Sequence, residues 1–509
     1  MASDDRSHAW LGVVVTFLAF AVVTRVTFFA PDSWSYLELS NTVFKDFYHV
    51  NTQRQYVLDT PYGISFPPLW PVLMATARLV IDLGLYTGVA LNFFICFGLL
   101  AALIRLVRVV NLPAWTGTSI YLGLLACTAF LEDAFAARNA ALSILLLTLA
   151  LHVVAQPGLG ATSSAAAGLW MGLACLNRFD ALIAAFAVGL IVTIQSPRRL
   201  ASFVAYYGAL SIALLPWIVY SHLQFNSFWV NDNTRQVLVA RDASVMNYYQ
   251  TPPQADLLTN FGNWLWGLLT NKIPMSWKGL VFCLIHSATL PLFAVVLVAC
   301  GPRLKWSRPS QRLVIWGMVL AGCFIMGPTL VGYGWERYFL PVQLFVILSL
   351  MAALITATPV FWTRTRVLLL LGVLCVAVMP RETVPWLVKY REKLHSMGWF
   401  TGLRKPTAAM MQLARAVDRD AHGQWSRLLI YSPSPEGWQE WEYGALTGHS
   451  VAVMPRVKTG TFESFLRDWR ITHIYDGQKV GKLVDPSVVN LVALDVPGLY
   501  RVEFRTAEK

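Results

Sequence analysis

The stretch "WLGVVVTFLAFAVVTRVTFFAPDSWSYLELS" (residues 10–40) decides how this chain is built. Its first twenty residues, 10–29, are almost entirely apolar, and an α-helix needs about that length to cross a bilayer. They lack a small-residue cleavage site and exceed the usual apolar core of a signal peptide, so we expect a retained first membrane span. The segment 31–40 follows at once and places Asp32 just beyond the end of the apolar run.

Composition extends this interpretation to most of the chain. Of the 509 residues, 56% are hydrophobic and only 13% are charged, whereas soluble domains carry about 25% charged residues. Apolar stretches recur to about residue 380, after which charged residues become frequent, as in a water-soluble domain. We therefore expect an α-helical polytopic membrane protein. Residues 1–380 form its transmembrane domain, and residues 381–509 form a small water-soluble domain.

The distribution of basic residues predicts the topology. Cytoplasmic loops of membrane proteins are enriched in Lys and Arg, and the basic pairs fall on one side if the N-terminus is cytoplasmic and the short apolar segment 67–84 is a juxtamembrane helix. The first outer loop (31–84), the long outer loop (221–277) and the C-terminal domain then lie on the periplasmic or extracellular side of the plasma (inner) membrane. The eleven expected spans are 10–29, 85–104, 113–131, 139–155, 163–177, 181–195, 200–220, 278–300, 312–332, 338–358 and 365–380.

The C-terminal region has the pattern of a small α/β domain. Short apolar runs typical of strands alternate with amphipathic helical patterns, which favours a mostly parallel sheet. No glycine-rich phosphate loop follows a strand, so we assign this domain no chemistry. The expected strands are 428–432, 451–455, 472–476 and 500–504, and the expected helices are 405–420 and 461–470.

Charge and cysteine usage exclude several other classes. The net charge of +12 comes from scattered pairs such as Arg198-Arg199 and forms no basic stripe, so we expect no nucleic-acid partner. All seven cysteines lie in apolar segments, as small buried hydrophobes rather than a disulfide framework. His286 is expected to be a core residue, because no His, Cys or carboxylate cluster has metal-ligand spacing. We therefore expect neither a metal nor another cofactor.

Asp32 has two interpretations that the sequence leaves open. Asp and Ser after Pro commonly start helices, and Ser35-x-x-Glu38 resembles a capping box. Alternatively, Asp32 is a partly desolvated carboxylate at the membrane boundary that serves as a general base for an acceptor hydroxyl. In that case an amphipathic helix follows it, with Trp34, Leu37, Phe44 and Phe47 facing the bilayer.

Six different short motifs follow one another along the chain. Taken in that order and at those positions, they resemble the GT-C superfamily of integral-membrane glycosyltransferases that use polyprenyl-phosphate sugars, such as the lipid-A aminoarabinose transferase and protein mannosyltransferase types. The resemblance covers essentially the whole chain. The motifs are "PDSWSYLELS" (31–40), "YGISFPPLWPVL" (62–73), "LEDAFAARNAAL" (131–142), "GLACLNRFDALI" (172–183), "LPWIVYSHLQFNSFW" (215–229) and "WERYFLPV" (335–342).

The resemblance assigns roles to the acidic residues. Asp32 matches the first-loop aspartate that acts as catalytic base in the family, and either Glu132 or Asp133 matches the second-loop acid. Judged from the residues alone, Glu132 and Asp133 are equally well explained as hydrated residues of a turn.

The resemblance also assigns the donor phosphate to cations on the outer face. Arg178 matches an outer-face arginine, and Arg337 with Tyr338 matches the pair before a late span. Without the resemblance, Arg178 and Asp180 could be an interfacial pair. Relatives that modify lipid A often carry Lys-Pro-Pro where Phe66 precedes two prolines here, so Arg54 is the candidate for the missing phosphate contact.

The implied function is transfer of a sugar from a polyprenyl-phosphate donor to a glycan, lipid or protein acceptor on the outer face of the membrane, with inversion. The rivals are a lipid-linked glycan flippase or other transporter, and a non-catalytic membrane subunit of a glycan-assembly complex. Transporters place ionisable residues near the bilayer midplane. Here the mid-span segments are nearly free of charge and the acids gather on one face, which favours the enzyme.

Overall fold

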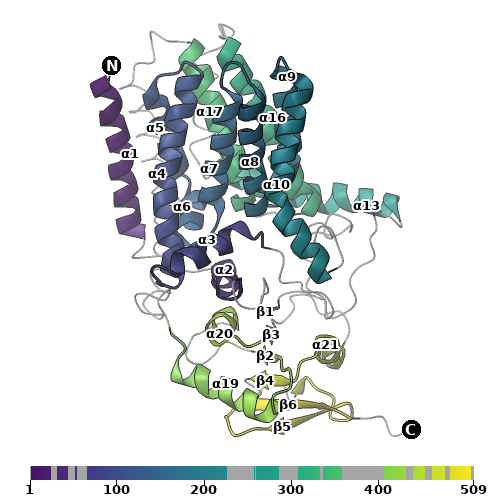
Figure 1. Cartoon of the computed structure of the whole chain (residues 1–509). Helices are drawn as coiled ribbons and strands as arrows, with labels where there is room; N and C mark the ends of the chain where they lie inside the picture. Colours follow the sequence, from purple (N-terminus) through teal and green to yellow (C-terminus); the bar gives the residue numbers. More distant parts are fainter. Residues whose placement is uncertain are drawn as a thin grey trace.

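The computed structural model combines a bundle of apolar helices with a small α/β sheet beyond one end of the bundle (Figure 1). Helix α1 begins at the opposite end, so the start of the chain and the sheet lie on opposite sides of the bundle. This is the relative placement that the charge distribution predicts. The structure describes residues 2–23, 31–43, 52–53, 66–225, 257, 260–285, 308–332, 336–357, 405–431, 440–452, 461–475 and 482–505.

The helices of the bundle are long and apolar, which makes this an integral membrane protein. Within the described residues, three helices are long and apolar enough to cross a membrane, or four if a bent pair counts as one span. Others are shorter: the 15 residues of α7 rise only about 22 Å, less than the roughly 30 Å of a bilayer core. The bundle helices are α1 (Ala2–Val23), α4 (Leu85–Val109), α5 (Ala114–Leu125), α7 (Ala140–Val154), α8 (Ala161–Asn177), α9 (Ala181–Gln195), α10 (Arg199–Phe225), α14 (Ile273–Ile285), α16 (Arg308–Val331) and α17 (Leu340–Ala357).

The expected count of eleven spans is not confirmed and stays a prediction. The expected span 365–380 lies outside the described residues, as does most of 278–300. The end of the expected long outer loop 221–277 is helical. There α13 (Phe261–Gly267) and the π-helix η2 (Leu268–Lys272) lead directly into α14, and α13 projects sideways from the bundle (Figure 1).

The third expected span is broken, which corrects the placement of Glu132 and Asp133. Helix α5 ends at Leu125, and the chain then turns by 82° into the short helix α6 (Thr128–Phe135). Both acids therefore lie within α6 and not in a turn after a straight span 113–131. Phe130 and Phe135 of α6 are fully buried, so the apolar residues that extend the hydrophobic pattern pack across the end of the bundle.

Helix α2 (Pro31–Thr42), which carries Asp32, is buried on all sides and does not face the bilayer. Trp34 and Leu37 are 5% and 4% exposed and belong to the main hydrophobic core, because α3 (Leu69–Arg78) and the C-terminal helix α20 (Glu440–Thr447) pack against α2. The helix begins four residues before Ser35, so Ser35 is not its N-cap and the expected capping box is wrong.

Arg78 connects α3 to α2. Its Nη1 donates to Ser40 Oγ at 2.8 Å and to Asn41 Oδ1 at 2.5 Å, and its Nε lies 2.7 Å from Asp82. Helix α3 is only ten residues long and lies across the end of the bundle (Figure 1), as expected for a segment 67–84 that does not span the membrane.

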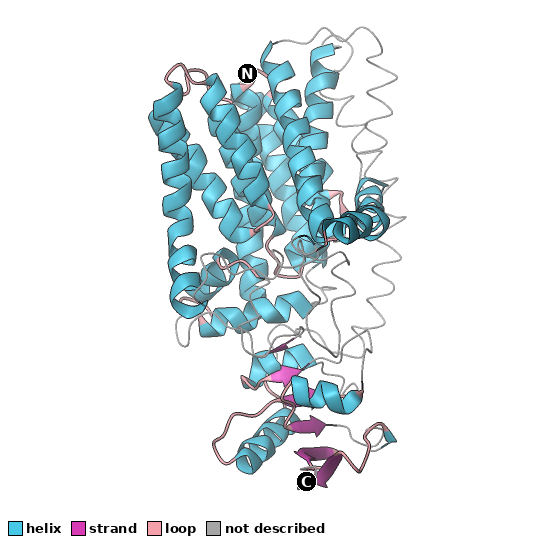
Figure 2. Cartoon of the chain, turned by 90° about the vertical axis from the view of Figure 1, so that its right-hand side faces the viewer, coloured by secondary structure: helices cyan, strands magenta, loops and turns pink. Residues whose placement is uncertain are grey.

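Five C-terminal strands and β1 form a six-stranded sheet, drawn in magenta in Figure 2, and the strand order is β1-β3-β2-β4-β6-β5. Pairs β1–β3, β3–β2 and β2–β4 are parallel, whereas β4–β6 and β6–β5 are antiparallel. One apolar cluster joins α19 and α20 to the sheet and a second joins α21 to it. The elements are β1 (Thr52–Gln53), α19 (Ala408–Ala421), β2 (Leu428–Ile430), α20, β3 (Val451–Ala452), α21 (Phe462–Asp468), β4 (His473–Tyr475), β5 (Val489–Ala493) and β6 (Leu499–Phe504).

Three of these elements were not expected from the sequence. Strand β5 and helix α20 lie between expected elements, and β1 comes from the first outer loop. Because Thr52 and Gln53 pair with β3, the sheet is completed by a segment of the transmembrane part of the chain.

Small residues allow helices α8 and α10 to approach closely, as is common between membrane helices. A Cβ added at Gly168 would lie 2.1 Å from the backbone oxygen of Tyr206, so no side chain fits there. Gly208, in α10, has no neighbour within 4 Å of such a Cβ. Gly168 is therefore a crowded position and Gly208 an open one, and the two can be compared by the same substitution.

We predict that Gly168→Ala lowers the free energy of unfolding by about 1–3 kcal/mol, the usual cost of overpacking. Gly208→Ala should be neutral or stabilise the protein by up to about 1 kcal/mol, because Ala is the better helix former. Thermal unfolding of the two purified variants in detergent measures the difference. Equal melting temperatures would contradict this packing of α8 on α10.

Candidate active site

Asp32 and Arg337 form an ion pair at the sheet-facing end of the bundle. Asp32 lies in the first turn of α2, and Arg337 lies in the 3₁₀ turn η4 (Glu336–Phe339) that precedes α17. Arg337 Nη1 contacts Asp32 Oδ2 directly, and the two side chains are only 24% and 15% exposed. Asp32 starts a helix, as one interpretation holds, but it is also a carboxylate paired with a cation in a partly buried site.

Tyr338 lies between two guanidinium groups. The Cζ atoms of Arg337 and Arg178 are 5.2 and 5.3 Å from the centre of its ring, within cation–π distance. Arg337 Nη2 donates to the Tyr338 hydroxyl at 3.4 Å, and Arg178 Nη2 donates to its backbone oxygen at 3.5 Å. The pair predicted from "WERYFLPV" and the arginine predicted from "GLACLNRFDALI" therefore meet.

Arg178 is held by Asp180 through two bonds. Its Nε and Nη2 donate to the two carboxylate oxygens at 3.1 and 2.7 Å, and the side chains are only 9% and 15% exposed. This is not the interfacial pair considered as an alternative, because both groups lie inside the protein. Burial works to lower the pKa of Arg178, but Asp180, Tyr338 and Asp133 hold it above its ordinary value.

Asp133 is the acid of α6 that faces the arginines. Its side chain is 4% exposed, and its Oδ2 accepts a 2.8 Å hydrogen bond from the backbone N–H of Ala140 at the start of α7. Burial works to lower the pKa of Arg337, but Asp32, Tyr338 and Asp133 hold it well above the ordinary value. Glu132 is 37% exposed, so the geometry favours Asp133 over Glu132 as the second acid.

Two neighbours of these residues were not expected from the sequence. Arg138 Nη1 lies 3.6 Å from Asp133 and 3.7 Å from Glu132, and its place in "LEDAFAARN" was the available signal. Tyr36 lies one turn after Asp32 on the same face of α2, at i+4. Burial, and then the charges of Asp32 and Asp133, raise the pKa of Tyr36, so its hydroxyl stays protonated.

Phe66, the departure from the family pattern, packs on Tyr36. The two ring centres are 5.0 Å apart in an edge-on arrangement. An apolar contact with the site therefore stands where the resemblance led us to expect a lysine. Arg54, the candidate for the missing phosphate contact, lies outside the described residues.

The segment after α6 is fixed by hydrogen bonds to its backbone. Ser33 Oγ donates to the oxygen of Ala136 at 2.5 Å, and Trp70 Nε1 donates to the oxygen of Ala137 at 2.8 Å. Ala137 has a positive φ of 56°, which an L-residue adopts only where its surroundings hold it. The helix that carries Asp32 is thus bonded to the segment that follows Glu132 and Asp133.

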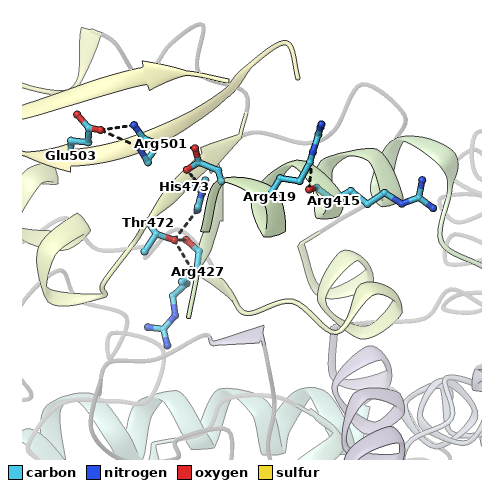
Figure 3. A network of polar contacts seen from close by, with 8 residues as sticks. Arg415, Arg419, Arg427, Thr472, His473, Arg501 and Glu503 are labelled. Atoms are coloured by element: carbon cyan, nitrogen blue, oxygen red, sulfur yellow. Dashed lines mark hydrogen bonds and ion pairs between the residues drawn. The ribbon is translucent and has the colours of Figure 1, made fainter. Parts of the chain in front are cut away.

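A second polar cluster lies in the C-terminal domain (Figure 3). His473 Nε2 is 3.1 Å from Asp420 Oδ2, and Arg501 Nη1 is 2.7 Å from Asp420 Oδ1. Burial lowers the pKa of His473. The neighbouring Thr472 hydroxyl donates to the backbone oxygen of Arg427 at 3.1 Å, so it is not poised as a nucleophile, and the cluster joins α19 to the sheet.

No cluster of three or more His, Cys, Asp or Glu side chains that could hold a metal ion occurs in the parts of the chain that the structure describes. Cys96, Cys127, Cys175 and Cys283 are buried free thiols, which confirms the expectation for these four, whereas Cys323 is half-buried. The other two cysteines and His286 lie outside the described residues.

The arrangement of helices and sheet matches solved glycosyltransferases. ArnT from Cupriavidus metallidurans, in a crystal structure with undecaprenyl phosphate, aligns over 98% of both chains with a TM-score of 0.50 and 13% identity. The mycobacterial arabinofuranosyltransferase AftD aligns over 99% of this chain and 41% of its own length, with a TM-score of 0.51 and 12% identity. The chain has the GT-C fold. No family model and no curated protein matches the sequence.

The GT-C fold confirms the fold inferred from the motifs.

The difference in burial between Asp133 and Glu132 leads to a testable prediction of stability. Asp133→Ala removes the partner of a buried arginine and the acceptor of the Ala140 N–H, so we expect a loss of about 3 kcal/mol of stability. Glu132→Ala removes a half-exposed partner of the same arginine and should cost less than about 1 kcal/mol. Thermal unfolding in detergent compares the two variants. If Glu132→Ala destabilises the protein as much as Asp133→Ala, Asp133 is not the buried acid of the site.

Proposed function

We propose that this protein is a glycosyltransferase that moves a sugar from a polyprenyl-phosphate donor to an acceptor hydroxyl. The observation that carries the proposal is the cluster of Asp32, Arg337, Tyr338 and Arg178 in a partly buried site at one end of the bundle. A carboxylate suited to be a general base lies beside two guanidinium groups suited to bind phosphate. The GT-C fold, shared with ArnT, supports a polyprenyl-phosphate donor.

The proposed chemistry is a single displacement with inversion. Asp32 takes the proton of the acceptor hydroxyl while that oxygen forms a bond to the anomeric carbon. The bond from the anomeric carbon to the phosphate oxygen breaks, and the polyprenyl phosphate leaves with the electron pair. Arg337 and Arg178 stabilise the charge that develops on this phosphate, because a guanidinium donates two parallel hydrogen bonds and stays charged. Asp133 keeps the arginines in place.

The site is proposed to lie on the outer side of the plasma (inner) membrane. The sheet and the site share one end of the bundle, whereas α1 begins at the other end (Figure 1). With a cytoplasmic N-terminus, the sheet would then be periplasmic or extracellular. The donor would reach the site from the bilayer, and the acceptor, a glycan, lipid or protein, from the outer side.

The described helices argue against a transport pathway through the bundle. Helices α8 and α9 contain no charged residue or histidine, and Arg105 and Arg108 of α4 and His152 of α7 lie within the last five residues of their helices. Transporters instead bind their substrates and ions near the bilayer midplane. A flippase is therefore the less favoured function.

The test uses purified protein in lipid nanodiscs with polyprenyl-phosphate sugars that carry a radioactive sugar. The wild type should transfer label to an acceptor extract, whereas Asp32→Asn should lose on the order of 10²–10⁴ in rate because Asn accepts no proton. Asn has nearly the same shape as Asp, and its Oδ1 can still accept a hydrogen bond from Arg337, so the variant should fold and still bind the donor. Transfer at near wild-type rate by Asp32→Asn would show that Asp32 only starts α2.

A further inference from the structure

The ion pair between Asp32 and Arg337 couples two roles that conflict. As the base, Asp32 must direct its carboxylate at the acceptor hydroxyl, and as a phosphate ligand, Arg337 must direct its guanidinium at the donor. The structure instead shows Arg337 Nη1 on Asp32 Oδ2. In this arrangement each group occupies the other, so neither is free for its proposed role.

The other arginines of the site offer no easy substitute for Arg337. Arg178 is bonded by both oxygens of Asp180, and Arg138 lies within 4 Å of Asp133 and Glu132. A phosphate that enters the site therefore meets cations that already have carboxylate partners. The Arg337 side chain is 24% exposed, whereas the Arg178 side chain is 9% exposed and donates two hydrogen bonds to Asp180. The incoming phosphate should therefore displace Asp32 before Asp180.

We propose that Arg337 prevents Asp32 from acting as a base until the donor phosphate binds. The phosphate then takes the place of Asp32 on the guanidinium and releases the carboxylate. This inference rests on the proposed function and adds an order to it: the donor binds before the acceptor can be deprotonated. The donor phosphate, a diester between polyprenol and sugar, carries one negative charge and two non-bridging oxygens that match two N–H groups of a guanidinium, so it competes with the Asp32 carboxylate for Arg337.

The surroundings of Asp32 offer it a second position after release. Tyr36 lies one turn further along α2, packed against Phe66, and carries a hydroxyl that can donate to a carboxylate. The start of α2 also favours a negative charge, because helix N-termini carry a partial positive charge. Asp32 can therefore leave Arg337 without becoming an uncompensated buried charge.

The test measures binding of undecaprenyl phosphate, which carries no sugar, to the full-length protein in nanodiscs. If Asp32 competes for Arg337, Asp32→Asn should bind this lipid at least about fivefold more tightly than the wild type. Arg337→Gln should bind it more weakly. The double variant Asp32→Asn with Arg337→Gln should gain nothing over Arg337→Gln alone, because there is no longer a guanidinium to release.

Glu132→Gln is the matched control, because it removes a negative charge from the same cluster without touching Arg337. It should change the affinity less than about twofold. Three outcomes would overturn the inference: no gain with Asp32→Asn, the same gain in the Arg337→Gln background, or an equal gain with Glu132→Gln. If the wild type binds undecaprenyl phosphate and transfers sugar in any of these cases, the proposed function is kept and only the inferred release of Asp32 is rejected. A wild type that fails to bind the lipid would overturn both.

Discussion

The contact between Asp32 and Arg337 depends on two distant parts of the chain meeting at one end of the bundle. Charges withdrawn from water are stable only when the geometry of the pair is fixed. On one side, Arg78 holds α2 to α3 and α20 packs over it. On the other side, η4 lies between the end of α16 and the start of α17. The rest of the fold fixes the position of α2 relative to η4.

The C-terminal domain takes part in this support. Helix α20 contacts α2 directly, and Asn41 Nδ2 donates to the backbone oxygen of Ala445 at 3.4 Å. Strand β1, from the loop after α2, adds to the edge of the sheet. The helix that carries the proposed base is therefore held between the bundle and the C-terminal sheet, and the two parts meet at the site.

Much of the site could be predicted from the sequence, because motif order places Asp32, Asp133, Arg178, Arg337 and Tyr338 near the same face, and the structure brings them together. Their roles remain proposals. The bend at Cys127 could not be predicted, because the apolar pattern continues across it. Nor could the burial of Trp34, since one of the helices that pack against α2, helix α20, comes from the far end of the chain. A local pattern reports an apolar face but not whether lipid or protein covers it.

The most direct test of this account is a structure of the protein in nanodiscs with undecaprenyl phosphate, determined by electron cryo-microscopy. We expect phosphate density bonded to Arg337 and near Arg178 and Tyr338, with the Asp32 carboxylate moved off Arg337 toward Tyr36. Phosphate density away from Arg337, or a phosphate bound there while the contact between Asp32 and Arg337 stays intact, would contradict it.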